Sequence, residues 1–243
     1  MFRRPKQPDR HGNDASAHRI PQHLSRALWG RAVSRSILRR VMAAPGLIHG
    51  SLGESCLHLC VDMQRLFAPG GPWPVPWAEK VLPAIEELVA SHPRQTLFTR
   101  FVPAARPGAG PGTWARYYNR WAKVTLSNID PSLVELMPSL ARFVPPAKLI
   151  DKRVYSPWTE GRLDAMLNGS KVDTLVITGG ETDVCVLATV LGAIDRGFRV
   201  VVVTDAVCSS ADPTHDALME LYRSRFSEQV EAASTAEVLD SWH

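Results

Sequence analysis

The feature that most constrains this 243-residue chain is an alternation of two residue patterns that begins near residue 55. Short runs of β-branched and aliphatic residues, such as Val200 to Val203, alternate with longer stretches whose apolar residues recur at helical spacing. Parallel strands are joined by helical crossovers, so this alternation is typical of a parallel sheet with helices on both faces. We therefore predict an α/β fold with strands over residues 57–62, 95–101, 148–154, 174–178, 199–204 and 229–232.

Helices are predicted between these strands from periodicity and from signals at their ends. Gly169 and Gly197 stand just past two periodic stretches, and glycine readily adopts the left-handed conformation that ends a helix. Pro213 suits the first turn of another helix. The predicted helices cover residues 77–91, a short segment after Pro131, 159–168, 183–196, a segment from Pro213, and 235–242.

The composition fits a chain that buries a sizeable core. It is 45% hydrophobic and 21% charged, and no apolar run reaches the roughly 18 to 20 residues that cross a bilayer. Its 4 cysteines are too few and too irregularly spaced for a disulfide scaffold, and we find no apolar secretion signal. We therefore expect a reducing compartment, a cytoplasmic location and no membrane partner.

Positive charge is concentrated near the amino terminus. Residues 1–45 contain ten Lys or Arg and two Asp, a net charge of +8, whereas residues 46–243 carry a net charge of −4. Such a segment could be an arm for nucleic acid or a membrane surface, a transit peptide, or solvated chain without a role. We predict a basic, disordered extension over residues 1–50 and one folded domain over residues 51–243.

Three chemically reactive residues fall at the carboxyl ends of predicted strands. Asp62 ends the first strand, Lys152 lies in or just after the third, and Cys185 lies in the turn after the fourth. Ligands of open parallel sheets bind at these ends, where the strand order reverses. The turn at Cys185 leads into a helix, and the free N–H groups there, together with a nearby ammonium, favour a thiolate.

Each of these residues also has a purely structural explanation. A cysteine is often buried as a small apolar residue, a carboxylate after a strand can cap a loop, and a lysine at a sheet edge can be solvated. Together, however, the ammonium would stabilise both anions, and the carboxylate could take the proton of the thiol during nucleophilic attack. Cys60 and Cys208 are flanked by strand-like sequence, and we predict that both are buried core residues.

The segments around these residues resemble the isochorismatase-like cysteine hydrolases. The resemblance covers residues 55–240 and rests on three ordered motifs. They are Asp62 within VDMQ with Phe67 and GGP downstream, Lys152 shortly before Tyr155, and Cys185 within TDVCV with RGFRV and TDA downstream. That superfamily includes nicotinamidases, ureidoacrylate and biuret amidohydrolases, and carbamoylsarcosine amidohydrolases.

The resemblance implies a doubly wound, mainly parallel six-stranded sheet and a role for each residue. Asp62 would be the general base and then the general acid, Lys152 would give electrostatic support, and Cys185 would be the nucleophile. It also implies a cis peptide bond between Gly180 and Glu181, which would turn the Glu181 N–H toward the Cys185 N–H to make an oxyanion hole. A homo-oligomer is the assembly that the resemblance suggests.

Departures from the family pattern bear on the substrate. Glu181 replaces a smaller residue, which leaves open whether its side chain turns away from the pocket or contacts the substrate. The closely spaced histidines that follow the second strand in nicotinamidases are missing, so we expect no metal and no other cofactor. We place Phe67 and Trp158 in the substrate pocket. Four roles are compatible with the next group of residues: a lid, a wall of the pocket, packing of an insertion, or a subunit interface. The group consists of Arg100, Trp114, Tyr117, Tyr118 and Trp121.

The sequence therefore favours a cysteine hydrolase that cleaves a C–N bond of a small amide or ureido compound through a thioester on Cys185. Cleavage of a vinyl ether, as in true isochorismatases, needs no thiol nucleophile. The alternatives are a non-catalytic binding protein of the same fold with a basic anion-binding tail, and a redox thiol protein, for which no resolving cysteine lies nearby in sequence. We expect a small-molecule substrate and no nucleic-acid partner, since residues 55–243 contain no nucleic-acid-binding motif.

Overall fold

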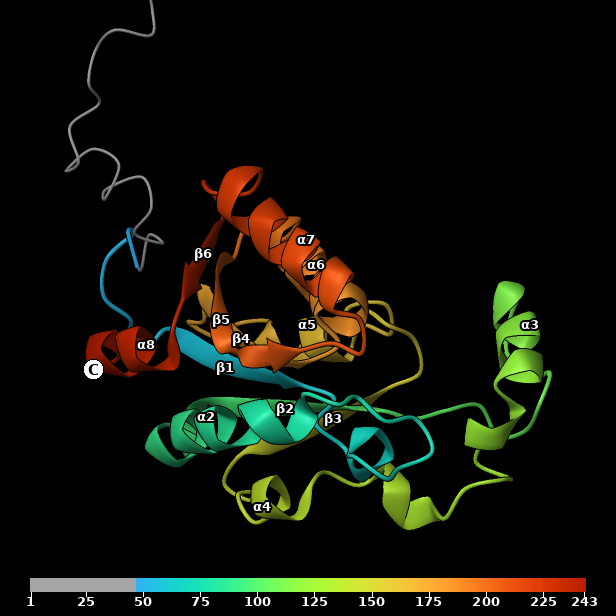
Figure 1. Cartoon of the computed structure of the whole chain (residues 1–243). Helices are drawn as coiled ribbons and strands as arrows, with labels where there is room; N and C mark the ends of the chain where they lie inside the picture. Colours follow the sequence, from blue (N-terminus) through green and yellow to red (C-terminus); the bar gives the residue numbers. More distant parts are fainter. Residues whose placement is uncertain (1–46) are drawn as a thin grey trace, which may run out of the picture. The chain divides into compact units, whose positions relative to one another are not determined.

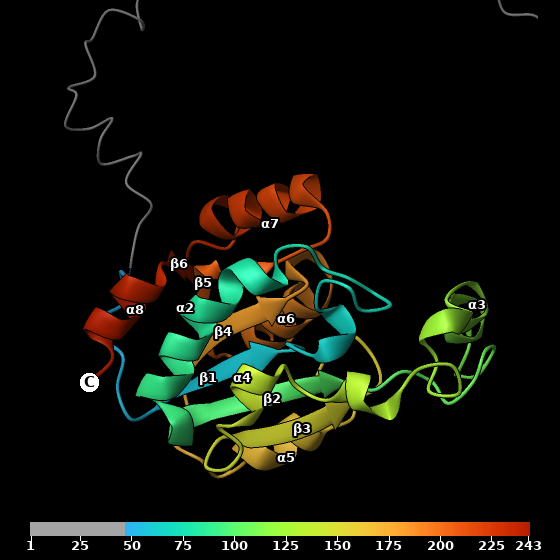
Figure 2. The ribbon, with the colours of Figure 1, turned by 60° about the horizontal axis from the view of Figure 1, so that its bottom comes forward.

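All six strands of the sheet run parallel. In the computed structural model, which describes residues 47–243, their order is β3-β2-β1-β4-β5-β6 (Figure 2). The chain moves outward from β1 to β3 at one edge and then returns to the centre at β4, so the strand order reverses between β1 and β4. This topology confirms the predicted doubly wound α/β fold.

The strands correspond to the six segments predicted from sequence. Their bounds are β1 (Cys56–Val61), β2 (Thr96–Phe101), β3 (Lys148–Lys152), β4 (Thr174–Gly180), β5 (Arg199–Cys208) and β6 (Val230–Ala233). The predicted extension over residues 1–50 lies outside the described part of the chain except for its last four residues, 47–50.

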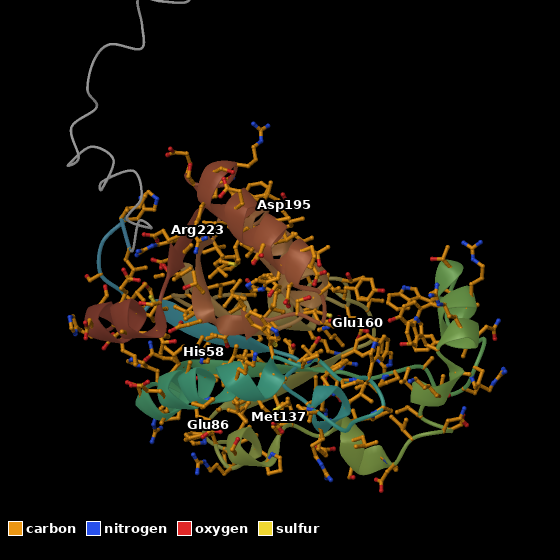
Figure 3. The ribbon with its side chains drawn as sticks, viewed as in Figure 1. His58, Glu86, Met137, Glu160, Asp195 and Arg223 are labelled. Atoms are coloured by element: carbon orange, nitrogen blue, oxygen red, sulfur yellow. The ribbon has the colours of Figure 1, made fainter. Side chains whose placement is uncertain are left out.

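Helices pack on both faces of this sheet (Figure 1). One face is covered by α2 (Ala78–Ser91), α4 (Pro138–Ala141) and α8 (Thr235–Ser241), and the other by α5 (Arg162–Leu167), α6 (Leu187–Ile194) and α7 (Asp212–Ser224). Figure 3 shows Glu86 of α2 and Arg223 of α7 on opposite sides of the sheet. No helix within residues 47–243 combines the length and the apolar character needed to span a membrane.

Two apolar cores result from the alternation of side chains along the strands. In β1, Cys56 and Cys60 join the core under α2 and α8, whereas Leu59 and Val61 join the core under α5, α6 and α7. Successive residues of a strand point to opposite faces, so one strand contributes to both cores. Cys60 and Cys208 are buried in the first core, as predicted.

β4 and β5 extend further than the sequence predicts. β4 reaches Gly180 and β5 reaches Cys208, and the register between them shifts between Ile177 and Gly179. Gly179 has a φ of +100°, and a Cβ there would lie 2.1 Å from the carbonyl oxygen of Val61. A residue without a side chain therefore lets β4 continue past the end of β1.

Two predicted helices begin later than expected. The segment 183–196 consists of a π-helical turn over Thr182–Val186 followed by α6. The segment 159–168 is reduced to α5, because Gly161, with a φ of +69°, holds a left-handed conformation immediately before it. After Pro131 the chain forms a 3-10 turn over Pro131–Val134 and then α4.

The aromatic segment, residues 114–121, lies mostly in a helix that the sequence did not predict, α3 (Thr113–Arg120). In both ribbon views α3 lies beyond the carboxyl ends of the strands, on the side where β1 and β2 end (Figure 1, Figure 2). It therefore stands at the end of the sheet where open α/β folds bind ligands.

Candidate active site

The side chains of Asp62, Lys152 and Cys185 meet at the carboxyl ends of the central strands. Lys152 Nζ lies 2.6 Å from Asp62 Oδ2 and 3.4 Å from Cys185 Sγ. The carboxylate and ammonium side chains are each 2% exposed, and Cys185 is 8% exposed. The fold thus brings the three candidate catalytic residues into contact in a largely buried site.

Lys152 reaches this site from the edge of the sheet. β3 pairs with β2, so the Lys152 side chain crosses β2 to reach Asp62 at the end of β1. Nζ lies 5.2 Å from the centroid of the Phe101 ring, and it also donates a hydrogen bond to the Val154 carbonyl at 3.2 Å. The aromatic face and the carbonyl both stabilise a buried ammonium.

Asp62 has an unusual backbone conformation that the neighbouring strand supports. Its φ is +53°, and no other non-glycine residue within 47–243 has a positive φ. The Thr99 hydroxyl of β2 donates to Asp62 Oδ1 at 2.6 Å, and the Asp62 N–H donates to the Thr99 carbonyl at 3.2 Å. One carboxylate oxygen therefore faces Thr99 and the other faces Lys152.

The electrostatics of the site keep the lysine charged and the cysteine neutral. Burial opposes the charged form of Lys152, but the Asp62 carboxylate outweighs it and raises the pKa of the ammonium. Burial raises the pKa of the Cys185 thiol above its ordinary value; the Lys152 ammonium lowers it, and the negative charge of Asp62 raises it again. The expectation of a thiolate is therefore wrong for this site, because burial and Asp62 outweigh the ammonium.

The turn between β4 and α6 carries Cys185. The Gly180–Glu181 peptide bond is cis, and the Glu181 carbonyl accepts hydrogen bonds from the N–H groups of Val184 and Val186, both at 3.0 Å. Within residues 47–243 the Glu181 N–H has no hydrogen-bond acceptor of its own. This donor lies in a residue that, like Cys185, lines the adjacent cavity, so it is available to a bound ligand.

Side-chain hydrogen bonds tie this turn to α7 and to the end of β5. Thr182 Oγ1 lies 2.9 Å from His215 Nδ1 of α7. The Asp183 carboxylate accepts hydrogen bonds from the hydroxyls of Ser209 and Thr214. These contacts fix the residues immediately before Cys185 and therefore limit the positions that its sulfur can take.

A cavity of about 100 Å³ opens beside Cys185 and Asp62. Its wall is mainly aromatic and aliphatic, as is usual for sites that bind small organic molecules. The predicted pocket residue Phe67 is part of the wall. The lining residues are Asp62, Met63, Phe67, Trp73, Val75, Ala78, Phe101, Tyr117, Tyr155, Gly180, Glu181, Val184, Cys185 and Cys208.

Trp158 does not line this cavity, so the pocket role predicted for it is wrong. Its indole is buried among the helices on the α6 side of the sheet, where Nε1 donates to the Thr189 carbonyl at 3.0 Å and the ring stacks on Phe198. A Cβ at Gly192 would lie 2.1 Å from the indole, so α6 makes room for it with a glycine. Core packing thus accounts for this tryptophan.

Arg100 is also absent from the wall. Its guanidinium lies 2.7 Å from Asp151 and 2.6 Å from Glu135, and these ion pairs hold it beside the sheet edge. Within the aromatic segment, Tyr117 lines the cavity, and Trp121 stacks on the lining residue Trp73 with ring centroids 5.3 Å apart. The segment is therefore a pocket wall in part.

The sequence analysis missed several residues of the site. Trp73 and Tyr155 line the cavity, and Thr99 binds Asp62. Gln64 is fully buried: its Oε1 accepts from the Phe101 N–H at 2.7 Å, and its Nε2 donates to the Phe101 carbonyl at 3.0 Å. Proximity to a motif was the one available signal, since Gln64 lies two residues after Asp62 and Tyr155 three after Lys152.

Within residues 47–243 no group of three or more His, Cys, Asp or Glu side chains is arranged to hold a metal ion. Cys208 lines the same cavity as Cys185, and burial raises the pKa of its thiol to about 12. The groups in direct contact at the site are the Asp62 carboxylate, the Lys152 ammonium and the Cys185 thiol.

A sequence profile of the isochorismatase domain matches residues 56–234. The chain belongs to the isochorismatase family. The resemblance that the motifs carry is thereby confirmed, and the matched segment contains the three candidate catalytic residues.

Curated relatives of this isochorismatase-family protein match over about a third of the chain. "Isochorismatase family protein 1A" of Dictyostelium discoideum is 36% identical over 81 residues, which cover 33% of this chain and 38% of that protein. "Secreted isochorismatase effector Isc1" of Phytophthora sojae (strain P6497) is 37% identical over 82 residues, which cover 32% of this chain and 38% of that protein. The matches thus span well under half the length of these relatives.

Solved structures share the fold over most of their length. A cysteine hydrolase from Pseudomonas syringae pv. phaseolicola has a TM-score of 0.65 and 23% identity, over 77% of this chain and 92% of that one. The nicotinamidase/pyrazinamidase PncA from Bacillus subtilis has a TM-score of 0.64 and 20% identity, over 74% of this chain and 99% of that one. At such identities the likeness establishes the α/β architecture.

Proposed function

We propose that this isochorismatase-family protein is a cysteine-dependent amidohydrolase that cleaves a C–N bond of a small amide or ureido compound. The observation that carries the proposal is the contact of Lys152 Nζ with both Asp62 and Cys185 at the wall of one cavity. A carboxylate that shares an ammonium with a neutral thiol can accept the proton of that thiol at the moment of attack. The structural neighbours named cysteine hydrolase and nicotinamidase support the same class of chemistry.

In the first half-reaction, Asp62 accepts the proton of Cys185 while the sulfur attacks the carbonyl carbon of the substrate. Lys152 stays protonated, so it stabilises the charge as it moves from carboxylate to sulfur. The N–H groups of Glu181 and Cys185 donate to the oxyanion that forms. Asp62 then gives its proton to the departing nitrogen, the C–N bond breaks, and a thioester remains on Cys185.

In the second half-reaction, a water molecule replaces the departed amine or ammonia. Asp62 accepts a proton from this water as its oxygen attacks the thioester carbonyl, and the same N–H groups bind the new oxyanion. The C–S bond breaks, the sulfur recovers a proton from Asp62, and for an amide substrate the carboxylic acid leaves. The residues of the site thus return to their starting protonation states.

An ammonia-release screen over small amides and ureido compounds tests this proposal. We expect turnover by the wild type, loss of turnover in Cys185→Ala, and an acyl adduct on Cys185 detectable by mass spectrometry. Cys60→Ala is the matched control, because Cys60 is a buried thiol of the core that lies off the cavity. Full turnover by a folded Cys185→Ala protein would refute the nucleophile.

A further inference from the structure

Glu181 carries the one unpaired charge on the cavity wall formed by residues 47–243. These lining residues include no Lys or Arg, and the other lining carboxylate, Asp62, is paired with Lys152. Glu181 Oε1 accepts a hydrogen bond from the backbone N–H of Ser210 at 3.0 Å, and no ion pair to Glu181 forms within the described residues. The wall therefore has a net negative charge.

The Glu181 carboxylate lies within electrostatic range of both the rim and the interior of the cavity. Tyr155, which is 36% exposed, and Cys208, which is 1% exposed, both line the cavity. Burial is the main reason that the pKa of each is raised, and the charge of Glu181 raises both pKa values further. A ligand group between these residues would experience the same negative field.

Aromatic rings form a continuous row along the same wall. The ring centroids of Phe67 and Trp73 lie 6.1 Å apart, those of Trp73 and Tyr117 5.8 Å apart, and those of Tyr117 and Tyr155 6.5 Å apart. Aromatic faces carry negative potential and attract cations, most strongly when water is excluded. A carboxylate beside such a row is the combination that recognises alkylammonium groups.

We propose that this cavity selects amides that carry a positively charged ammonium group. The carbonyl of the substrate would lie at Cys185, which rests on the proposed function, and the ammonium would lie against Glu181 and the row of aromatic rings. A substrate carboxylate would be disfavoured, because the lining residues within 47–243 offer it no cationic partner and Glu181 would repel it. Charge thereby determines which small amides bind.

Binding to the Cys185→Ala protein measures this selectivity without turnover. We would compare three benzamides that differ mainly in the charge of the para substituent: 4-(aminomethyl)benzamide, the neutral 4-ethylbenzamide and the anionic 4-carbamoylbenzoate. Calorimetry at low salt should show the cation bound on the order of tenfold more tightly than the neutral amide, and the anion most weakly.

The double variant Cys185→Ala, Glu181→Gln assigns the selectivity to one carboxylate. Glutamine keeps a carbonyl oxygen for the Ser210 N–H and removes only the charge, so the preference for the cation should fall to roughly threefold or less. Glu79→Gln in the same background is the matched control, since Glu79 is an exposed carboxylate of α2 that does not line the cavity.

Three results would overturn the inference: no binding of the cation, equal or tighter binding of the neutral or anionic amide, or a cation preference that survives Glu181→Gln. If that variant does not fold, a salt titration of Cys185→Ala decides, because rising salt should weaken binding of the cation and spare the neutral amide. Hydrolysis assays of the wild type separate the two proposals. Cation-selective binding without hydrolysis contradicts the amidase chemistry alone, and hydrolysis without cation selectivity contradicts this inference alone.

Discussion

Two buried polar clusters, one at His58 of β1 and one at Asp62 directly after that strand, differ in charge. At the first, His58 Nε2 lies 2.7 Å from Thr178 Oγ1 and Nδ1 lies 3.3 Å from Thr96 Oγ1, which bridges β1 to both of its neighbours. Figure 3 shows His58 within the sheet, between the two layers of helices. At the second, Asp62 contacts Lys152, and this pair lies at the wall of the cavity.

The protonation states of the clusters differ for a physical reason. Burial, and to a smaller extent His92, lowers the pKa of the His58 imidazole to about 3, so this ring is neutral and both of its nitrogens have hydroxyl partners. The Asp62 cluster instead keeps an ammonium at full burial through its ion pair. The comparison indicates that a fully hydrogen-bonded neutral group holds strands together, whereas a charged set beside a cavity can exchange protons with a ligand.

Asp62→Asn should have the largest effect on activity. The amide oxygen can still accept the Thr99 hydrogen bond, but the group can no longer take the proton of Cys185, so we expect kcat/KM to fall at least about 10³-fold. Steady-state kinetics with an amide from the screen measures this loss. His58→Gln, in the neutral cluster, should retain most of the activity; a loss of equal size in both variants would remove the distinction between the clusters.

Lys152→Met should have the largest effect on stability. It leaves the Asp62 carboxylate buried without its ammonium, so we expect the free energy of unfolding to fall by about 3 to 5 kcal/mol in chemical denaturation. Arg153→Met is the matched control, because this neighbouring cation is 62% exposed in its ion pair with Glu160 and should contribute less than about 1 kcal/mol. Equal losses at the two positions would show that burial of the pair does not matter.

The neutral cluster should make the fold sensitive to acid. The pKa of His58 is about 3 in the folded chain against an ordinary 6.5, so between these values the unfolded chain binds more protons. The stabilisation is complete above pH 6.5 and is lost as pH falls toward 3, by up to about 1.4 kcal/mol per pH unit. Unfolding curves of the wild type and His58→Gln, measured from pH 7 to roughly 4.5, should converge as the pH falls. Parallel curves would contradict a neutral buried histidine.

Thr99→Val should have the smallest effect and refines the comparison within the charged cluster. It removes one hydrogen bond to Asp62 and leaves the ion pair with Lys152, so we expect a loss of about 1 kcal/mol in stability and a fall in kcat of roughly five- to tenfold. Thermal unfolding and steady-state kinetics measure the two effects. An activity loss as large as that of Asp62→Asn would mean that Thr99, rather than Lys152, sets the orientation of the carboxylate.

Much of the fold could be predicted because its signals are local. The alternation of residues such as Cys60 and Val61 between two faces, and the glycines that end helices, are properties of neighbours along the chain. The ends of β4 and β5 could not be predicted, because Gly179 is required by the backbone of Val61 on another strand. Contacts between residues on different strands produce no periodic pattern in the sequence, so they cannot be predicted from it.

The sequence predicted the three reactive residues of the candidate site but not most of the residues that form the cavity wall. The positions at strand ends and the family motifs were enough to predict Asp62, Lys152 and Cys185. Trp158 was predicted to lie in the pocket, but it belongs to the core under α6. Tyr155, three residues before it, lines the cavity. Which of two nearby aromatic side chains faces a ligand depends on the path of the backbone, and short-range sequence does not specify that path.

The sequence by itself determined the α/β architecture and the positions of three reactive residues at strand ends. Both depend on the spacing of apolar residues and on the alternation of strands and helices, which are local properties of the chain. Only the tertiary structure decided that Cys185 is a neutral thiol, that Lys152 crosses β2 to reach Asp62, and that Glu181 is left unpaired within the described residues on an aromatic wall. Protonation states and cavity walls depend on distance and burial in space, which residues far apart in sequence set jointly.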